Sequence, residues 1–284
     1  MNLVTVCGHN TTMLHHLLVH YQPLVKNFYV NIYANFKQDP IIKEVTSICE
    51  NLGIKPFKVW IEKPFDWAKV TKIYNDTISS KPNEWWIVAD DDEFQIYAKP
   101  IYEIIEECEE NDWEFVRGGF LDRIGENGSF PNINKESNVW KEMPNAGFFR
   151  YPLSSAEPNK VTLIKGCHKL TPGQHFIDFG HGKKSLVIEK KLCYPVEKNF
   201  TQVHHFKWDN SVLQRLKTVS KSNINKPVSM EYKKMLDAIE KFDFKLNLDD
   251  KRFMFERVDL PKYSNYSKWN LLKDKILKIG DTQT

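Results

Sequence analysis

Short apolar runs alternate with amphipathic segments through the N-terminal half of the chain. Each apolar run has the length of a strand, and each amphipathic segment has the length of a helix. The expected strands are Leu3–Cys7, Asn27–Tyr33, Pro56–Ile61, Trp85–Ala89 and Trp113–Leu121. The expected helices end near Pro23, Asn51, Ser79 and Asn111. This alternation predicts an α/β fold built on a parallel, Rossmann-like sheet.

The pattern changes from Phe148 onward, where short β-like pieces are separated by glycine and proline turns. These pieces predict a smaller antiparallel part. They are Phe148–Tyr151, Val161–Lys165 and Leu186–Ile188. Beyond Lys221 the chain is charged and helical, with expected helices at Ser229–Phe242 and Tyr266–Ile279. We therefore expect a catalytic domain at 1–220 and a helical extension at 221–284 packed on it, although the last helix is amphipathic enough to lie on a membrane surface.

Four acidic residues directly follow the most apolar of the expected strands. The run Trp85-Trp86-Ile87-Val88-Ala89 is typical of a strand buried on both faces, and Asp90-Asp91-Asp92-Glu93 comes at its carboxyl end. In open α/β sheets this edge is where ligands bind. Clustered carboxylates repel one another unless a cation lies among them. Oxygen ligands favour Mg²⁺ or Mn²⁺ completed by phosphate and water, so the run predicts a metal site.

Other interpretations of the acidic run are a charged turn, a calcium loop and a phosphatase site. The calcium loop fails because its turn glycine would fall at Gln95 and its bidentate acid at Ile101. A phosphatase or nucleotidase would use Asp90 as the nucleophile and Asp92 as the acid. Phe94 stands where such an enzyme is expected to carry a small hydroxyl or β-branched residue.

A second concentration of polar chemistry is the run His204-His205-Phe206-Lys207-Trp208. A neutral imidazole could complete a metal shell, and the Lys207 ammonium could pair with phosphate. Neighbouring residues of a strand point to opposite faces, so only one histidine is expected to be a ligand, and we favour His205. The alternative is that this run only caps and packs the following helix.

Both runs resemble motifs of one enzyme family. Asp90–Phe94 after a buried strand resembles the Asp-x-Asp-Glu-Phe signature of GT-A glycosyltransferases of the family 2-like and family 92-like group, and His204–Trp208 is similar to the downstream histidine block of that group. The resemblance covers roughly residues 3–220. It implies a GT-A fold with helices on both faces of a mostly parallel sheet. It also implies Mn²⁺ or Mg²⁺ held by Asp90, Asp92 and His205 against the diphosphate of a UDP- or GDP-sugar.

The resemblance further implies transfer to a hydroxyl of a glycan, lipid or protein acceptor, with inversion at the sugar carbon. Asp122, which is followed by Arg123 as in many members of the group, is the expected general base, with His175 as second choice and a structural salt bridge as the alternative role of Asp122. The residues expected to contact the donor are Thr5, Cys7, Asn10, Asp91, Lys160 and Lys207. A non-catalytic module that binds sugar nucleotides is the remaining interpretation.

Composition limits the possible classes of protein further. The chain has 284 residues, 41% hydrophobic and 27% charged, enough for one sizeable core. Its 40 basic and 37 acidic residues are too balanced to indicate a nucleic-acid partner. Five scattered cysteines without a Cys-x-x-Cys motif indicate neither a disulfide framework nor a zinc site. No signal peptide and no apolar run of about 20 residues is recognised, so a cytoplasmic protein, with peripheral membrane contact as a variant, is expected.

Overall fold

The computed structural model describes residues 1–63, 65–149, 159–180, 183–195, 198, 201–222, 226–250 and 255–258. The chain forms two compact units. Of the described residues, the first unit holds 1–119 and 159–203, and the second holds 120–149 and 204–258. The units interleave along the sequence, because strands β6 (Phe115–Ile124) and β9 (Thr201–His205) each begin in the first unit and end in the second.

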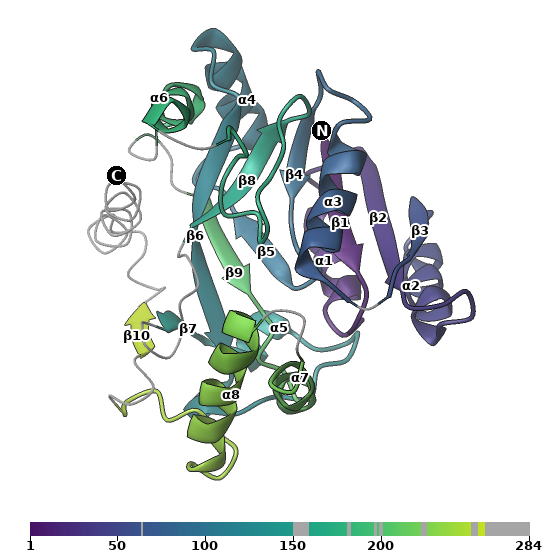
Figure 1. Cartoon of the computed structure of the whole chain (residues 1–284), viewed down its shortest axis with the longest axis vertical. Helices are drawn as coiled ribbons and strands as arrows, with labels where there is room; N and C mark the ends of the chain where they lie inside the picture. The colour runs from purple at the N-terminus through teal and green to yellow at the C-terminus, as the bar shows by residue number, and fades with distance from the viewer. Residues whose placement is uncertain are drawn as a thin grey trace. The chain divides into compact units, whose positions relative to one another are not determined.

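The first unit contains the predicted alternation of strands and helices, which Figure 1 follows by label. Its strands are β1 (Asn2–Cys7), β2 (Asn27–Ala34), β3 (Lys58–Ile61), β4 (Trp85–Val88), β5 (Glu93–Ile96) and β8 (Asn159–Lys165) with the first parts of β6 and β9. Its helices are α1 (Leu14–Tyr21), α2 (Pro40–Asn51), α3 (Trp67–Ile78), α4 (Ile101–Glu110) and α6 (Lys183–Leu192). Asp39 and Asp66 cap α2 and α3, since their carboxylates accept hydrogen bonds from Ile41 N and Ala68 N.

The sheet of the first unit is mixed. Its strand order is β6-β8-β4-β1-β2-β3. Strands β4, β1, β2 and β3 are parallel, whereas β8 is antiparallel to both β4 and β6. Every residue of β1 and β4 is buried, as expected for the central strands of a parallel sheet. The predicted Rossmann-like α/β fold with an antiparallel part is confirmed.

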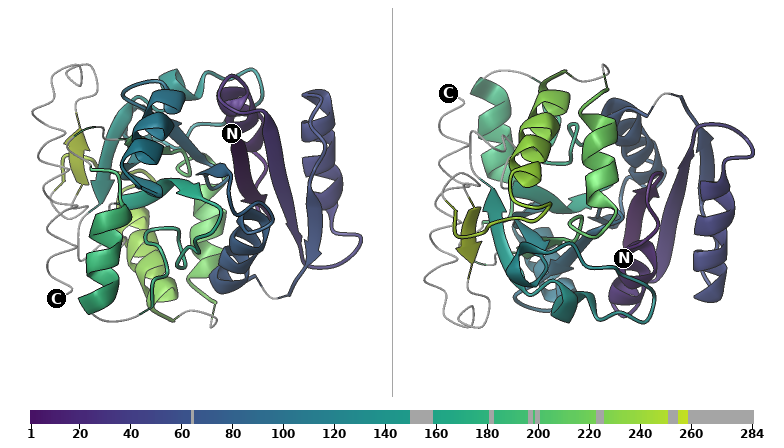
Figure 2. Two further views of the ribbon diagram at one scale, coloured as in Figure 1. Left: turned by 90° about the horizontal axis from the view of Figure 1, so that it is seen from above. Right: turned by 90° about the horizontal axis from the view of Figure 1, so that it is seen from below.

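Helices cover both faces of this sheet. Side chains of a strand alternate between its faces, so Val4 and Val6 of β1 lie on one face, where they share a core cluster with Tyr74 of α3. Figure 1 shows α3 in front of β1. Cys7 is buried, and its thiol lies close enough to Cys49 of α2 for that residue to raise its pKa. Helix α2 packs along β2, as Figure 2 shows.

The second unit is antiparallel and helical. It contains the ends of β6 and β9, the 3-10 turn η1 (Glu126–Gly128), α5 (Val139–Glu142), β7 (Asn145–Phe149), α7 (Val212–Val219), α8 (Lys226–Glu240) and β10 (Phe255–Val258). Strand β7 pairs antiparallel with both β6 and β10. Trp208 and Ile124 are buried with Leu216 of α7 and Ile239 of α8 in one apolar cluster. Of the pieces predicted as antiparallel after Phe148, the first overlaps β7 in this unit, whereas Val161–Lys165 belongs to β8 in the first unit.

Two sequence predictions need comment. Leu186–Ile188, predicted as a strand, lies inside α6, because three apolar residues between lysines are too few to set a period, and Lys190 and Lys191 favour a helix C-terminus. Residues 150–151 and the predicted helix 266–279 lie outside the described residues. The division into a catalytic domain and an extension at residue 220 stays a prediction. No helix within the described ranges is long and apolar enough to cross a membrane.

Candidate functional site

The acidic loop, Asp90–Asp92 with Glu93 at the start of β5, lies at the carboxyl end of β4 as predicted. The loop is anchored to the neighbouring parallel strand, because Ala89 N donates to Val4 O at 3.3 Å. It turns tightly, since Glu93 N donates back to Asp90 O at 3.0 Å. The sheet therefore brings the acids to the edge at which α/β proteins bind ligands.

Lys160, at the start of β8, lies between two of these acids. Its Nζ is 3.0 Å from Asp90 Oδ2, 2.7 Å from Glu93 Oε1 and 3.1 Å from Gln174 Oε1. These three acceptors match the three N–H groups of the ammonium. Burial by itself would lower the pKa of Lys160, but the Asp90 and Glu93 carboxylates raise it above its ordinary value. A permanent cation thus neutralises part of the acidic loop.

Tyr74 of α3 fixes the other oxygen of Asp90. The Tyr74 Oη lies 2.9 Å from Asp90 Oδ1 and 2.9 Å from Ala89 O. Burial, followed by the charges of Asp90 and Glu93, raises the pKa of Tyr74 well above its ordinary value, so the hydroxyl stays a donor. Asp90 is consequently held in one orientation from two sides.

The end of β1 lies beside the loop. Cys7 interacts with Asp91, and burial followed by the Asp91 charge raises the pKa of the Cys7 thiol well above its ordinary value. The protonated thiol donates to Asn10 O at 3.6 Å, while Asn10 Oδ1 accepts from Thr12 N at 3.0 Å. Thr5 is fully buried within β1. The structure thus brings Cys7 and Asn10 to the acidic loop, whereas Thr5 lies one pleat further back along the strand.

His175 is also close to the loop. Its Nδ1 lies 2.6 Å from Asn159 O, so the ring donates from Nδ1 when neutral. Burial and then the Lys160 charge lower the pKa of His175 to about 4. The ring is therefore neutral at physiological pH and is a weak proton acceptor.

The acidic loop offers a metal only oxygen ligands. The Asp90 side chain is 33% exposed, and Asp92 is 9% exposed. Each Asp90 oxygen accepts one hydrogen bond and keeps a second lone pair. This donor set fits a hard divalent cation that completes its shell with ligand oxygens and water. Asp90 and Asp92 as ligands, and the metal itself, stay predictions.

The second unit places Asp122 and His205 together. Asp122 Oδ1 accepts hydrogen bonds from His205 Nδ1 at 2.9 Å and from Trp208 Nε1 at 2.8 Å. Burial alone would raise the pKa of Asp122, but the hydrogen bond from His205 and the charge of Lys207 bring it below its ordinary value. The ionised carboxylate therefore fixes the Nδ1–H tautomer of His205 and leaves the lone pair on Nε2.

The two adjacent histidines meet different surroundings, as the alternation of a strand requires. The His205 ring lies 4.6 Å from the ring of Phe120, and the His204 ring lies 5.1 Å from that of Trp140. Lys207 Nζ lies 4.9 Å from the ring centroid of Trp208. His205 and Lys207 belong to the second unit, and Asp90 and Asp92 to the first, so a single site containing all four stays a prediction.

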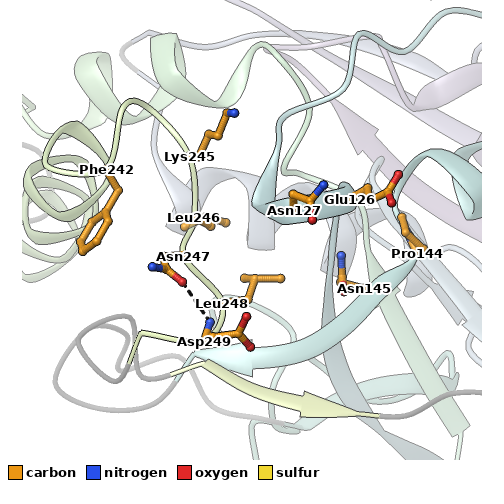
Figure 3. Close-up of a pocket in the computed structure, with 10 residues that line it drawn as sticks. All are labelled: Glu126, Asn127, Pro144, Asn145, Phe242, Lys245, Leu246, Asn247, Leu248 and Asp249. Carbon is orange, nitrogen blue, oxygen red and sulfur yellow. Dashed lines mark hydrogen bonds between the residues drawn. The ribbon is translucent and has the colours of Figure 1, made fainter.

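A cavity of about 440 Å³ also lies in the second unit (Figure 3). Asn127 and Asn145 line it from one direction, and Leu246, Leu248 and Asp249 line it from the segment that follows α8. The Asn247 side chain accepts a hydrogen bond from Asp249 N at 3.2 Å at its rim. None of the site residues predicted from the sequence lines this cavity.

Sequence reasoning missed three residues that shape the acidic loop. Tyr74 and Gln174 carry no motif, and only the folded sheet brings them to Asp90 and Lys160. Glu93 stood in the acidic run, but its pairing with Lys160 depends on the position of β8 beside β4.

No family model matches the sequence, and no curated protein matches it. A search of solved structures found S. aureus TarS 1-349 in complex with UDP, at a TM-score of 0.34 and 9% identity, over 93% of this chain and 77% of that chain. A longer TarS structure gives a TM-score of 0.33 and 9% identity, over 86% of this chain, which spans 43% of that one. A chain from Bacillus anthracis described as a glucose-1-phosphate thymidylyltransferase, in complex with a sucrose, gives a TM-score of 0.38 and 11% identity. The match covers 82% of this chain and 98% of that chain. Similarity at this level carries no argument about activity, which has to come from the site.

Proposed function

We propose that this protein is a metal-dependent glycosyltransferase of the GT-A family 2-like and family 92-like group. It transfers a sugar from a UDP- or GDP-sugar to a hydroxyl of a glycan, lipid or protein acceptor, with inversion. The observation that supports the proposal most is the acidic loop at the carboxyl end of β4, in which Lys160 and Tyr74 hold Asp90 in one orientation. A pre-oriented carboxylate at a ligand-binding edge costs no reorganisation when a metal and a diphosphate bind.

On the donor side, Asp90 and Asp92 would hold Mn²⁺ or Mg²⁺, which when bound neutralises charge on the leaving nucleoside diphosphate. Lys160 offsets one of the two negative charges of Asp90 and Glu93, so these three side chains together keep one negative charge for a divalent cation. Asp91 lies at Cys7, beside Asn10, where the end of β1 would face the nucleotide.

On the acceptor side, Asp122 is proposed as the base and His175 as the second choice. A pKa of about 4 makes His175 a weak base near neutrality, and Asp122, whose pKa lies below its ordinary value, is limited in the same way, so the order of the two choices rests on the resemblance. The Asp122–His205 pair has the arrangement that supports a ligand histidine, in which a carboxylate fixes the ring through Nδ1–H. This supports His205 as a metal ligand, with Lys207 directed to phosphate. The same proposal includes a cytoplasmic location, with peripheral membrane contact as a variant.

A phosphatase or nucleotidase remains the second candidate, and one observation favours it. The Lys160 ammonium lies 3.0 Å from Asp90, where it could also stabilise a phosphorylated aspartate. The two candidates differ in product, because a phosphatase releases inorganic phosphate and a glycosyltransferase releases a nucleoside diphosphate.

A thermal-shift panel tests donor recognition. Nucleoside diphosphate sugars are added with and without Mn²⁺ to the wild type and to Asp92→Asn. A ligand that binds only the folded state raises the unfolding midpoint, so the cognate donor should raise it for the wild type only when Mn²⁺ is present. Asp92→Asn should lose that shift while keeping the midpoint of the free protein. An equal shift in the variant would place the metal elsewhere.

A further inference from the structure

Three side chains with metal-binding chemistry converge in the first unit, away from the acidic loop. Glu114 directly precedes β6, while Cys167 and His168 follow β8. One carboxylate oxygen, the thiol sulfur and one ring nitrogen of these residues all lie within 4.8 Å of one another. His168 Nε2 is already hydrogen-bonded to Glu114 Oε2. Within the described part of the chain, this is the group in which three such ligand atoms come together.

The backbone around the three residues is held by the sheet. Lys165 N donates to Glu114 O at 2.9 Å, and His168 N donates to Lys165 O at 3.2 Å. Gly166 forms the turn between them, and a Cβ at that position would lie 2.1 Å from Lys81 O, so only glycine fits. The ligand side chains are thus carried by strand ends with fixed positions, which favours a preorganised site.

The cluster is separate from the acidic loop. Strand β8 carries Lys160, which binds Asp90 and Glu93, near its start, and Cys167 follows its end. At ~3.3 Å per residue, the extended strand puts about 16 Å between Lys160 and Lys165 at its end, and Cys167 lies in the turn that follows. A metal at the cluster would therefore not contact a donor diphosphate at the acidic loop.

We propose that Glu114, Cys167 and His168 bind one Zn²⁺ ion, with water as the fourth ligand. One sulfur, one nitrogen and one oxygen ligand form a set that a borderline-soft, tetrahedral cation prefers over Mg²⁺ or Mn²⁺. Zn²⁺ replaces the hydrogen bond between His168 and Glu114, the ring proton of His168 moves from Nε2 to Nδ1, and the Cys167 thiol releases its proton to solvent on binding. Because Cys167 is exposed, the ion can enter from solvent.

Co²⁺ is the probe for the test, because a thiolate ligand gives it an intense sulfur-to-cobalt absorption and a tetrahedral site gives it strong visible bands. The full chain, freed of metal, should show both with one Co²⁺ per chain, and Zn²⁺ should remove them by competition. Cys167→Ser should abolish the sulfur band. His168→Gln and Glu114→Gln should each weaken Co²⁺ binding at least about tenfold.

Cys193→Ser is the matched control, since Cys193 is a partly buried cysteine of the same unit outside the cluster. It should leave the sulfur band unchanged. Asp92→Asn should also leave it unchanged, which separates this site from the proposed donor site. Absence of the band in the wild type, or a band that survives in Cys167→Ser, would overturn the proposal. Circular dichroism of each variant would show that loss of binding is not loss of the fold.

Discussion

Removing the Lys160 charge should destabilise the first unit strongly. Lys160→Met keeps most of the apolar stem and volume of the side chain but removes the ammonium. The ammonium has three acceptors, on Asp90, Glu93 and Gln174, and the Lys160 side chain is only 5% exposed. The variant therefore leaves two carboxylates beside each other without their cation.

The size of the effect follows from how buried each partner is. The Glu93 side chain is 3% exposed, so without Lys160 its charge stays buried without the ammonium that offsets it, although Asp90 N still donates to it at 3.3 Å. Removing one member of a buried ion pair costs about 3–5 kcal/mol. The Asp90 side chain is 33% exposed and is partly screened by water, so it adds less than about 1 kcal/mol. We expect the free energy of unfolding to fall by about 3 kcal/mol or more.

Urea denaturation followed by tryptophan fluorescence measures this loss. Lys165→Met is the matched control, because Lys165 lies on the same strand and pairs with Glu109 at the same 3.0 Å, but the two side chains are 24% and 50% exposed. The control should lose about 1 kcal/mol or less. Adding Glu93→Gln to Lys160→Met should restore part of the stability. Equal losses in Lys160→Met and Lys165→Met would refute the reasoning.

Three other predictions concern the proposed catalytic groups. Asp122→Asn should lower the transfer rate by about 10²–10⁴-fold in a steady-state assay at saturating donor and Mn²⁺, and near-normal turnover would make Asp122 structural. Mn²⁺ affinity measured by calorimetry should weaken as pH falls, because the His205 imidazole must be neutral to bind the ion. His205→Ala should flatten this pH dependence, and Lys207→Ala should weaken binding of nucleoside diphosphate more than binding of nucleoside, whereas changes in stability alone would indicate helix packing. The pKa of His175 is about 4 in the folded protein and 6.5 ordinarily. Between pH 6.5 and 4 the ring therefore binds a proton in the unfolded state but not in the folded state, and the free energy of unfolding falls as the pH drops through this range. His175→Gln should remove up to about 3 kcal/mol of that dependence in urea titrations, and parallel curves for both proteins would contradict the assignment.

Local sequence signals were sufficient to predict strands and helices of the N-terminal half of the fold. The apolar runs of β1 and β4 each extend over a few residues, so periodicity locates them. The position of the acidic loop could also be predicted from the sequence, because the carboxyl end of a buried parallel strand is a defined edge of the sheet. The prediction of a strand at Leu186–Ile188 was wrong, because an apolar run of this length does not distinguish a helix from a strand.

The contacts inside the site depended on long-range pairing. Lys160 and Asp90 are 70 positions apart, and they meet because β8 pairs antiparallel with β4. Glu114 and His168 are 54 positions apart and meet through the pairing of β8 with β6. Cysteine spacing gave no indication of the second cluster, because its ligands come from the ends of two strands and not from one local motif.

The most direct measurement of the central claim is the product formed from a nucleotide sugar. The wild type and Asp92→Asn are incubated with UDP- and GDP-sugars, with water as the acceptor of the sugar, and separately with a simple phosphate monoester. Each incubation is run with and without Mn²⁺, and released nucleoside diphosphate and inorganic phosphate are quantified separately. The glycosyltransferase account predicts Mn²⁺-dependent release of the nucleoside diphosphate, loss of that release in Asp92→Asn, and no inorganic phosphate. Release of inorganic phosphate, or equal release of nucleoside diphosphate by Asp92→Asn, would contradict it.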